Sequence, residues 1–164
     1  MYHVPVMLNE CLDGLNIQPN GIYVDVTFGG GGHSKKILEQ LSDKGKLFAF
    51  DVDDDAKRNI PNDKRFTLIQ ANYRHLKRYL KLYGVKKVNG ILADFGISSY
   101  QIDEPSRGFA TRFDAPLDMR MNNKEGISAK DVVNTYSAEQ LQNILGFYGE
   151  VINAKTLANT IVEQ

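Results

Sequence analysis

Four consecutive glycines, Gly29 to Gly32, stand between a β-like run and a helical run. Glycine tolerates positive φ and lets another molecule approach the backbone, and the free N–H groups at a helix N-terminus bind polar ligand groups. Asp51 lies twenty residues after Gly31, at the end of the next β-like run, where a carboxylate can accept two hydrogen bonds from a ribose diol. The spacing predicts a nucleotide-type cofactor site, and the alternative is a tight structural turn.

The pattern around the glycines narrows the kind of cofactor. The dinucleotide fingerprint G-x-G-x-x-G fails, because Ser34 stands where its third glycine would be. The arrangement acid-x-x-x-G-x-G-G, which begins at Asp25, fits S-adenosylmethionine (SAM) better, since an acid near the turn suits the cationic amino group of that cofactor. We therefore expect SAM, and a NAD-dependent oxidoreductase is the weaker alternative.

Three further residues are candidates for the same site. Asp94 ends a fourth β-like run, where it would face the cofactor sulfonium or the methyl acceptor; its Asp-Phe-Gly triplet lacks the other elements of a kinase. Tyr73 follows the third run and either stacks on adenine or is the first core residue of the next helix. His33 either touches the cofactor or only opens a helix. The acidic run Asp51 to Asp55 lacks the glycine and glutamate of a calcium loop, so no metal site is predicted.

Hydrophobic periodicity predicts an α/β fold that positions these residues. Strand-like runs alternate with helical ones, which predicts parallel strands with crossover helices in a Rossmann-like sheet and places ligands at the carboxyl ends of the strands. The expected strands are 22–28, 46–50, 66–70 and 88–95, and the expected helices between them are 35–41, 54–60 and 73–83. A doubly wound sheet normally has five or six strands, so we expect an incomplete sheet.

Composition excludes several classes of protein. The 164 residues contain 20 Lys and Arg and 20 Asp and Glu, so any binding to nucleic acid must use a local patch. The single cysteine, Cys11, excludes an intrachain disulfide and fits a reducing compartment. No apolar run approaches the roughly 20 residues that span a bilayer, and no signal peptide is evident. We expect a soluble cytoplasmic protein without a membrane partner.

Five blocks taken together resemble the MraW family of ribosomal RNA methyltransferases. They are Thr27–Ser34, Asp94–Gln101, Arg107–Phe109, Asp114–Met121 and Tyr148–Glu150. The resemblance implies a SAM-dependent enzyme that methylates N4 of a cytidine in the 16S rRNA of the small ribosomal subunit.

The resemblance also implies roles for individual residues. Asp94 would orient the target amine or bind cofactor, which makes it the catalytic candidate. The cofactor-binding residues would be Gly31, Gly32, His33, Asp51, Tyr73, Asp94 and Gln101. Arg107, Arg112 and Arg120 are candidate phosphate contacts.

The chain departs from the family in two respects. The family is about twice as long, so we expect residues 1–102 to form a SAM-binding half-domain, 103–127 a loop or lid, and 128–164 the start of a helical substrate-recognition insertion. Val151 and Ile152 replace a Glu-Arg pair, which removes one arginine that could face RNA. The competing hypothesis is a truncated, inactive SAM-binding fragment that forms a homodimer through the exposed edge of its fourth strand.

Overall fold

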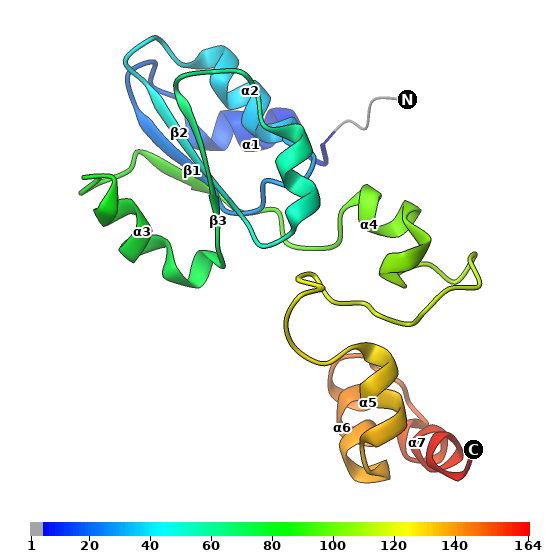
Figure 1. Ribbon diagram of the computed structural model, residues 1–164. Coiled ribbons are helices and arrows are strands. Elements are labelled where there is room, and N and C mark those ends of the chain that lie inside the picture. Colours follow the sequence, from blue (N-terminus) through cyan, green and yellow to red (C-terminus); the bar gives the residue numbers. More distant parts are fainter. Residues whose placement is uncertain (1–4) are drawn as a thin grey trace. The chain divides into compact units, whose positions relative to one another are not determined.

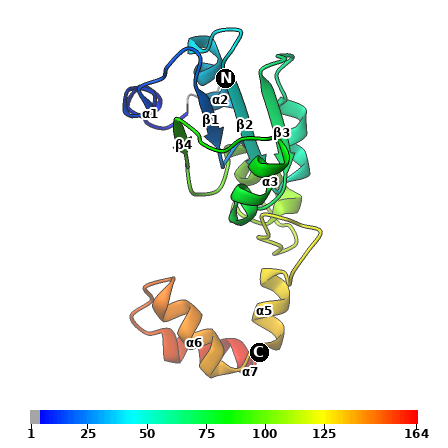
Figure 2. The same cartoon turned by 90° about the vertical axis from the view of Figure 1, so that its left-hand side faces the viewer.

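The computed structural model describes residues 5–164, which form two compact units that divide between Tyr100 and Gln101. The first unit contains a four-stranded sheet in the order β3-β2-β1-β4, and every pair of neighbours is parallel. Figure 2 shows the strands side by side in this order. They are β1 (Ile22–Asp25), β2 (Lys46–Asp51), β3 (Phe66–Gln70) and β4 (Gly90–Leu92). The predicted α/β fold with a parallel sheet is confirmed.

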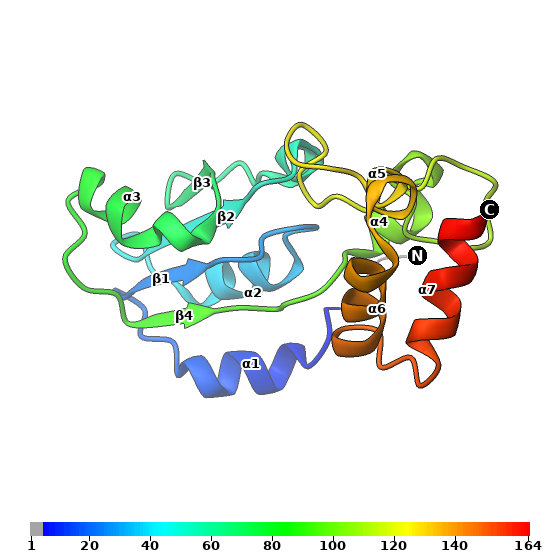
Figure 3. The ribbon, with the colours of Figure 1, turned by 90° about the horizontal axis from the view of Figure 1, so that it is seen from below.

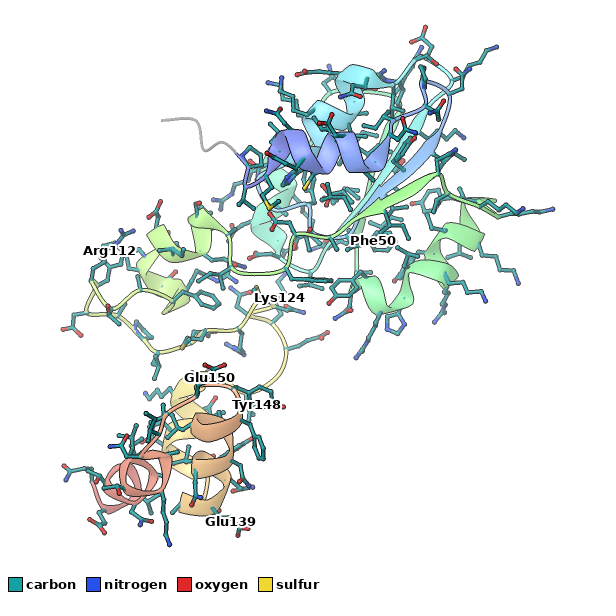
Figure 4. The ribbon with its side chains drawn as sticks, turned by 180° about the vertical axis from the view of Figure 1, so that it is seen from behind. Phe50, Arg112, Lys124, Glu139, Tyr148 and Glu150 are labelled. Atoms are coloured by element: carbon teal, nitrogen blue, oxygen red, sulfur yellow. The ribbon has the colours of Figure 1, made fainter. Side chains whose placement is uncertain are left out.

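Helices cover both faces of this sheet. Its α-helices are α1 (Leu8–Leu15), α2 (Gly32–Gln40) and α3 (Leu76–Leu82), and its 3-10 helices are η1 (Asp54–Asn59) and η2 (Tyr73–His75). Figure 1 shows α1 and α2 on one side of the strands and α3 on the other. Alternate strand residues point to opposite faces: Tyr23 and Leu47 belong to the core under α1 and α2, whereas Val24 and Phe48 belong to the core under α3. Phe50, labelled in Figure 4, is fully buried in the second core.

Several element boundaries differ from those predicted, and α2 begins at Gly32 instead of Lys35. The first and fourth strands are shorter because the chain turns away from the ladder after Asp25 and after Leu92. Some pairing continues beyond them, since the Val26 N–H donates to the Leu92 carbonyl. The helix predicted from Tyr73 begins as a 3-10 turn, because the Asn72 side chain accepts from the Arg74 N–H before α3 starts. Propensity and periodicity do not resolve such ends.

The edge strand β4 pairs only with β1 among the described strands. The sheet is therefore incomplete in the described part of the chain, as predicted. Dimerisation through this edge stays a prediction. No helix within residues 5–164 is long and apolar enough to cross a membrane.

The second unit, from Gln101 onward, is helical and loop-rich. Its helices are the end of α4 (Ser99–Asp103), η3 (Pro105–Arg107), α5 (Ala129–Thr135), α6 (Ala138–Phe147) and α7 (Ala154–Glu163). Reciprocal capping boxes start α5 at Ser128 and α6 at Ser137. Helices α6 and α7 pack side by side (Figure 3). The proposed three-part division of the chain stays a prediction.

Candidate functional site

The glycine turn follows β1 and is held by the segment after β2. The Gly29 N–H donates to Asp51 Oδ2 at 2.7 Å, and the Gly29 carbonyl accepts from Asn59 Nδ2 at 2.9 Å. Because β1 and β2 are parallel, both loops lie at the carboxyl edge of the sheet. The structure thus joins the glycine turn and Asp51 directly, as their spacing predicts for one site.

Three of the four glycines differ in the space that a side chain would have at their positions. Gly31 has φ 75° and caps α2, and a Cβ there would lie 3.0 Å from the Phe28 ring. A Cβ on Gly32 would lie 2.3 Å from Cγ of Pro5, so the N-terminal segment packs on this position. A Cβ on Gly30 would meet nothing within 4 Å. The backbone is open to a ligand at Gly30, while Gly31 is required by the turn and Gly32 by the packing of Pro5.

Asp51 keeps the capacity to bind a ligand. Its Oδ1 accepts from the Asp53 N–H at 2.9 Å and its Oδ2 from Gly29, which leaves one acceptor position on each oxygen. The side chain is half-buried. Burial raises the pKa of the Asp51 carboxyl, and hydrogen bonds from backbone N–H groups, that of Asp53 first, act in the opposite direction. Two remaining acceptor positions on one carboxylate match a pair of vicinal hydroxyls.

Asp94 and His33 lie together at the same edge. The Asp94 N–H donates to Thr27 Oγ1 at 2.8 Å, and Asp94 Oδ2 is 4.0 Å from His33 Nδ1. His33 Nε2 is 3.1 Å from the Val6 carbonyl, which can only accept, so this nitrogen carries the proton. The ring is buried, whereas the Asp94 side chain is 44% exposed. The Asp94 carboxylate is accessible to a substrate, and the buried His33 imidazole lies next to it.

Tyr73 offers an aromatic face after β3. Its side chain is 44% exposed and its ring lies 5.8 Å from the ring of Phe95, which is also exposed. The two interpretations of Tyr73 were core packing and stacking on a ligand, and its exposure favours the second. Phe95 completes a two-ring surface that the sequence alone did not identify.

Asp25 does not face a ligand, contrary to the interpretation that it suits a cationic amino group. It is 1% exposed, and its oxygens accept from the Ser34 hydroxyl at 2.7 Å and the Thr27 N–H at 3.0 Å. Burial raises the pKa of this carboxyl against those hydrogen bonds. Asp25 therefore ties the end of β1 to the first turn of α2.

The remaining predicted residues lie in the second unit. Gln101 is buried in α4. Arg107 is 3% exposed, and its Nη2 donates to the carbonyls of Arg120 and Met121, each at 2.9 Å. This burial contradicts the predicted phosphate contact for Arg107, which instead holds the loop of the Asp114–Met121 block in place.

Arg112 and Arg120 are more accessible, but both already have partners. Arg112 is exposed, bonds Asp103 and stacks its guanidinium 4.8 Å from the Phe113 ring centroid. Arg120 forms a forked pair with Asp118, with 2.6 Å between Nη2 and Oδ2, and this pair lowers the pKa of the Asp118 carboxyl. Phosphate binding by these two arginines stays a prediction.

Sequence reasoning missed three contacts that position the site. Thr27 orients the Asp94 backbone, Asn59 holds the Gly29 carbonyl, and the Val6 carbonyl fixes the His33 ring. Thr27 belongs to the Thr27–Ser34 block, but no motif or periodicity in the sequence indicates a role for Asn59 or Val6. Within residues 5–164, no group of three or more His, Cys, Asp or Glu side chains is placed to hold a metal ion.

Comparisons with known proteins agree with the resemblance in the sequence. The curated relatives include proteins named ribosomal RNA small subunit methyltransferase H from three bacteria. That of Christiangramia forsetii is 58% identical over 163 residues, which is 99% of this chain and 54% of the relative. Those of Flavobacterium johnsoniae and Cytophaga hutchinsonii are each 59% identical, covering 99% and 100% of this chain and 54% and 55% of the relatives.

The chain spans about half the length of these curated relatives. The profile of the MraW methylase family matches residues 1–164, the whole of the sequence. The chain therefore belongs to the MraW methylase family.

Proposed function

We propose that residues 5–100 bind SAM for methyl transfer to N4 of a cytidine in the 16S rRNA of the small ribosomal subunit. The observation that carries this proposal is the 2.7 Å hydrogen bond between the Gly29 N–H and Asp51 Oδ2, which joins the glycine turn to the acid after β2. Family membership supports the reaction class, and the names of the relatives support an rRNA substrate.

The residues present fit this cofactor. The open space at Gly30 admits a ligand against the backbone, and Asp51 has acceptor positions left for ribose hydroxyls. Tyr73 and Phe95 offer rings on which an adenine can stack. SAM, when bound, supplies a methyl group on a sulfonium, which is a strong electrophile and a good leaving group.

Asp94 is the residue that we assign to the target amine. Its carboxylate is accessible and its backbone is fixed by Thr27, so it can accept a hydrogen bond from the exocyclic N–H of cytosine and direct the nitrogen lone pair. His33 Nδ1, 4.0 Å away, can share a proton with Asp94 Oδ2 after the amine loses one. These roles are positioning and proton holding, and they require no metal.

Cofactor identity is tested by calorimetry with SAM and with NAD. We expect SAM to bind and NAD not to bind. Asp51→Ala should weaken SAM at least about tenfold, because it removes a charged acceptor of two hydrogen bonds. Asp43→Ala removes an exposed carboxylate of the same unit and should leave the affinity unchanged. SAM binding that ignores Asp51, or a preference for NAD, would refute the cofactor assignment.

The reaction is tested on small ribosomal subunits that lack the modification. We expect methyl incorporation at cytidine N4 with radiolabelled SAM, and Asp94→Ala should reduce it by about 100-fold or more, since a positioning group is lost. If Asp94→Ala left both SAM affinity and methyl transfer unchanged, the role given to Asp94 would be wrong.

A further inference from the structure

Positive charge is concentrated in one part of a chain that has no net charge. No Asp or Glu occurs between Asp63 and Asp94, a stretch of thirty residues. The same stretch contains eight of the twenty Lys and Arg. An accessible cluster in this region would supply the local patch that binding to nucleic acid requires in a chain of zero net charge.

The helical part of this stretch arranges four cations in a line. Arg74, Lys77, Arg78 and Lys81 have the spacing i, i+3, i+4, i+7, which places them on one side of η2 and α3, and all four are exposed. We call these four residues the basic stripe. The opposite side is apolar and packs on the sheet through residues such as Leu80. Figure 4 shows side chains along α3 extending away from the strands.

The basic stripe has no acidic partners among residues 5–164. Within the described part of the chain, no carboxylate lies within ion-pair distance of any of its four cations, and Arg74 Nε donates only to the His75 ring. Elsewhere in this unit, Lys36, Lys57 and Arg58 each pair with an acid three residues away. Like charges at i, i+4 destabilise a helix, so the stripe carries a free-energy cost that an anionic partner would offset.

The stripe begins where the proposed site is. Tyr73 immediately precedes Arg74 and follows β3 at the carboxyl edge of the sheet, where Asp51 also lies. From there α3 leads away along one face (Figure 1). The exposed rings of Tyr73, Phe95 and Tyr83 flank the same segment. Cations interleaved with exposed aromatic rings are typical of surfaces that bind a phosphate backbone and stack unpaired bases.

We propose that the basic stripe of η2 and α3 binds phosphates of the RNA substrate next to the cofactor site. This inference rests on the proposed function, because the RNA is the substrate of that site. Seven residues of helix span about 10 Å, so the stripe contacts a short run of the backbone. It reads no sequence, since phosphate contacts position an RNA and do not specify its bases.

The test is the salt dependence of binding to a short fluorescein-labelled single-stranded RNA, measured by anisotropy. The triple variant Lys77→Gln, Arg78→Gln, Lys81→Gln should lose at least about tenfold in affinity, and the slope of log K against log salt should become shallower by about 2, or about 0.7 for each lost contact. The charge-conserving variant Lys77→Arg, Lys81→Arg should keep the wild-type affinity and slope.

The matched control removes three other exposed lysines of the same unit. Lys35→Gln, Lys44→Gln, Lys46→Gln changes the net charge equally and should change the RNA affinity far less. Equal losses in the two triple variants, or an unchanged slope in the stripe variant, would overturn the proposal. Binding of vesicles of anionic phospholipid through the stripe, without binding of RNA, would also overturn it.

Calorimetry with SAM separates this inference from the proposed function. The stripe variant should keep its SAM affinity, because the stripe contacts neither Asp51 nor the glycine turn, and it should unfold at a temperature no lower than that of the wild type, because the repulsion between like charges is relieved. If the wild type failed to bind SAM but bound RNA through the stripe, the cofactor assignment alone would fail. If SAM bound normally and the stripe variant bound RNA like the wild type, the stripe proposal alone would fail.

Discussion

Asp25 and Asp51 are the last residues of the neighbouring strands β1 and β2, and each follows an apolar β-like run in the sequence. Asp25 is fully buried, and its oxygens accept hydrogen bonds from Thr27 and Ser34. Asp51 is half-buried and holds the glycine turn with acceptor positions to spare. The Asp25 carboxylate therefore stabilises the fold, whereas the Asp51 carboxylate faces the candidate site. The difference comes from burial, which depends on how α2 packs over β1.

At the residue scale, Ser34→Ala should destabilise the protein by about 1–3 kcal/mol at a pH where Asp25 is ionised, because a buried carboxylate loses a donor. The serine hydrogen bond lowers the pKa of Asp25, so it favours the charged form, while burial holds that pKa above 3.8. The loss should be full above the folded pKa of Asp25 and should shrink as pH falls through it. Urea denaturation at several pH values measures this.

Ser42→Ala is the control for Ser34→Ala. Ser42 bonds the neutral side chain of Asn20 in an exposed setting, so its loss should be small and independent of pH. A Ser34→Ala effect that stayed constant through the pH range in which Asp25 titrates would show that the hydroxyl does not act through the charge of Asp25.

At the element scale, the glycine turn contains one glycine that the backbone conformation requires, Gly31, and one that leaves space for a ligand, Gly30. Gly31→Ala should cost about 1–3 kcal/mol, because a left-handed residue at φ 75° is strained and its Cβ would press on Phe28. Gly30→Ala should change stability by less than about 0.5 kcal/mol, since its Cβ meets no atom within 4 Å. It should nevertheless weaken SAM binding about tenfold or more by filling the space that we assign to the ligand.

Thermal unfolding and calorimetry on the two variants distinguish these effects. Unchanged SAM affinity in Gly30→Ala would contradict close approach of the ligand at this glycine. A stable Gly31→Ala variant would contradict the strain assigned to the turn.

The elements themselves were largely predictable from local patterns. The run Phe66–Gln70 is a strand with the predicted bounds. Strand and helix alternation also predicted parallel pairing, because short connections and right-handed crossovers leave few other topologies. The 3-10 start at Tyr73 was not predictable, since it depends on one hydrogen bond that the Arg74 N–H donates to the Asn72 side chain.

Long-range contacts set the limit of prediction at the site. The glycines, Asp51 and Asp94 were found because their residue types and their places after strands carry the signal. The burial of Arg107 was not predictable, because its partners are carbonyls of residues 120 and 121 in a loop without periodicity. Asn59 was missed for the same reason, since its contact with Gly29 crosses thirty residues.

At the scale of the whole molecule, the two units should differ in local stability. Among the described residues, the unit from Gln101 onward buries only three apolar side chains, Leu141, Ala154 and Ala158, whereas the first unit buries sixteen. Local stability follows buried apolar contacts. Amides of β1 and β2 should therefore exchange with solvent slowest, and those of α5, α6 and α7 should exchange orders of magnitude faster, as measured by hydrogen exchange with mass spectrometry. Leu141→Ala should speed exchange in α6 and α7 and leave β1 and β2 protected. Equal protection of the strands and the three helices would show that the helical unit draws stability from contacts other than its own small core.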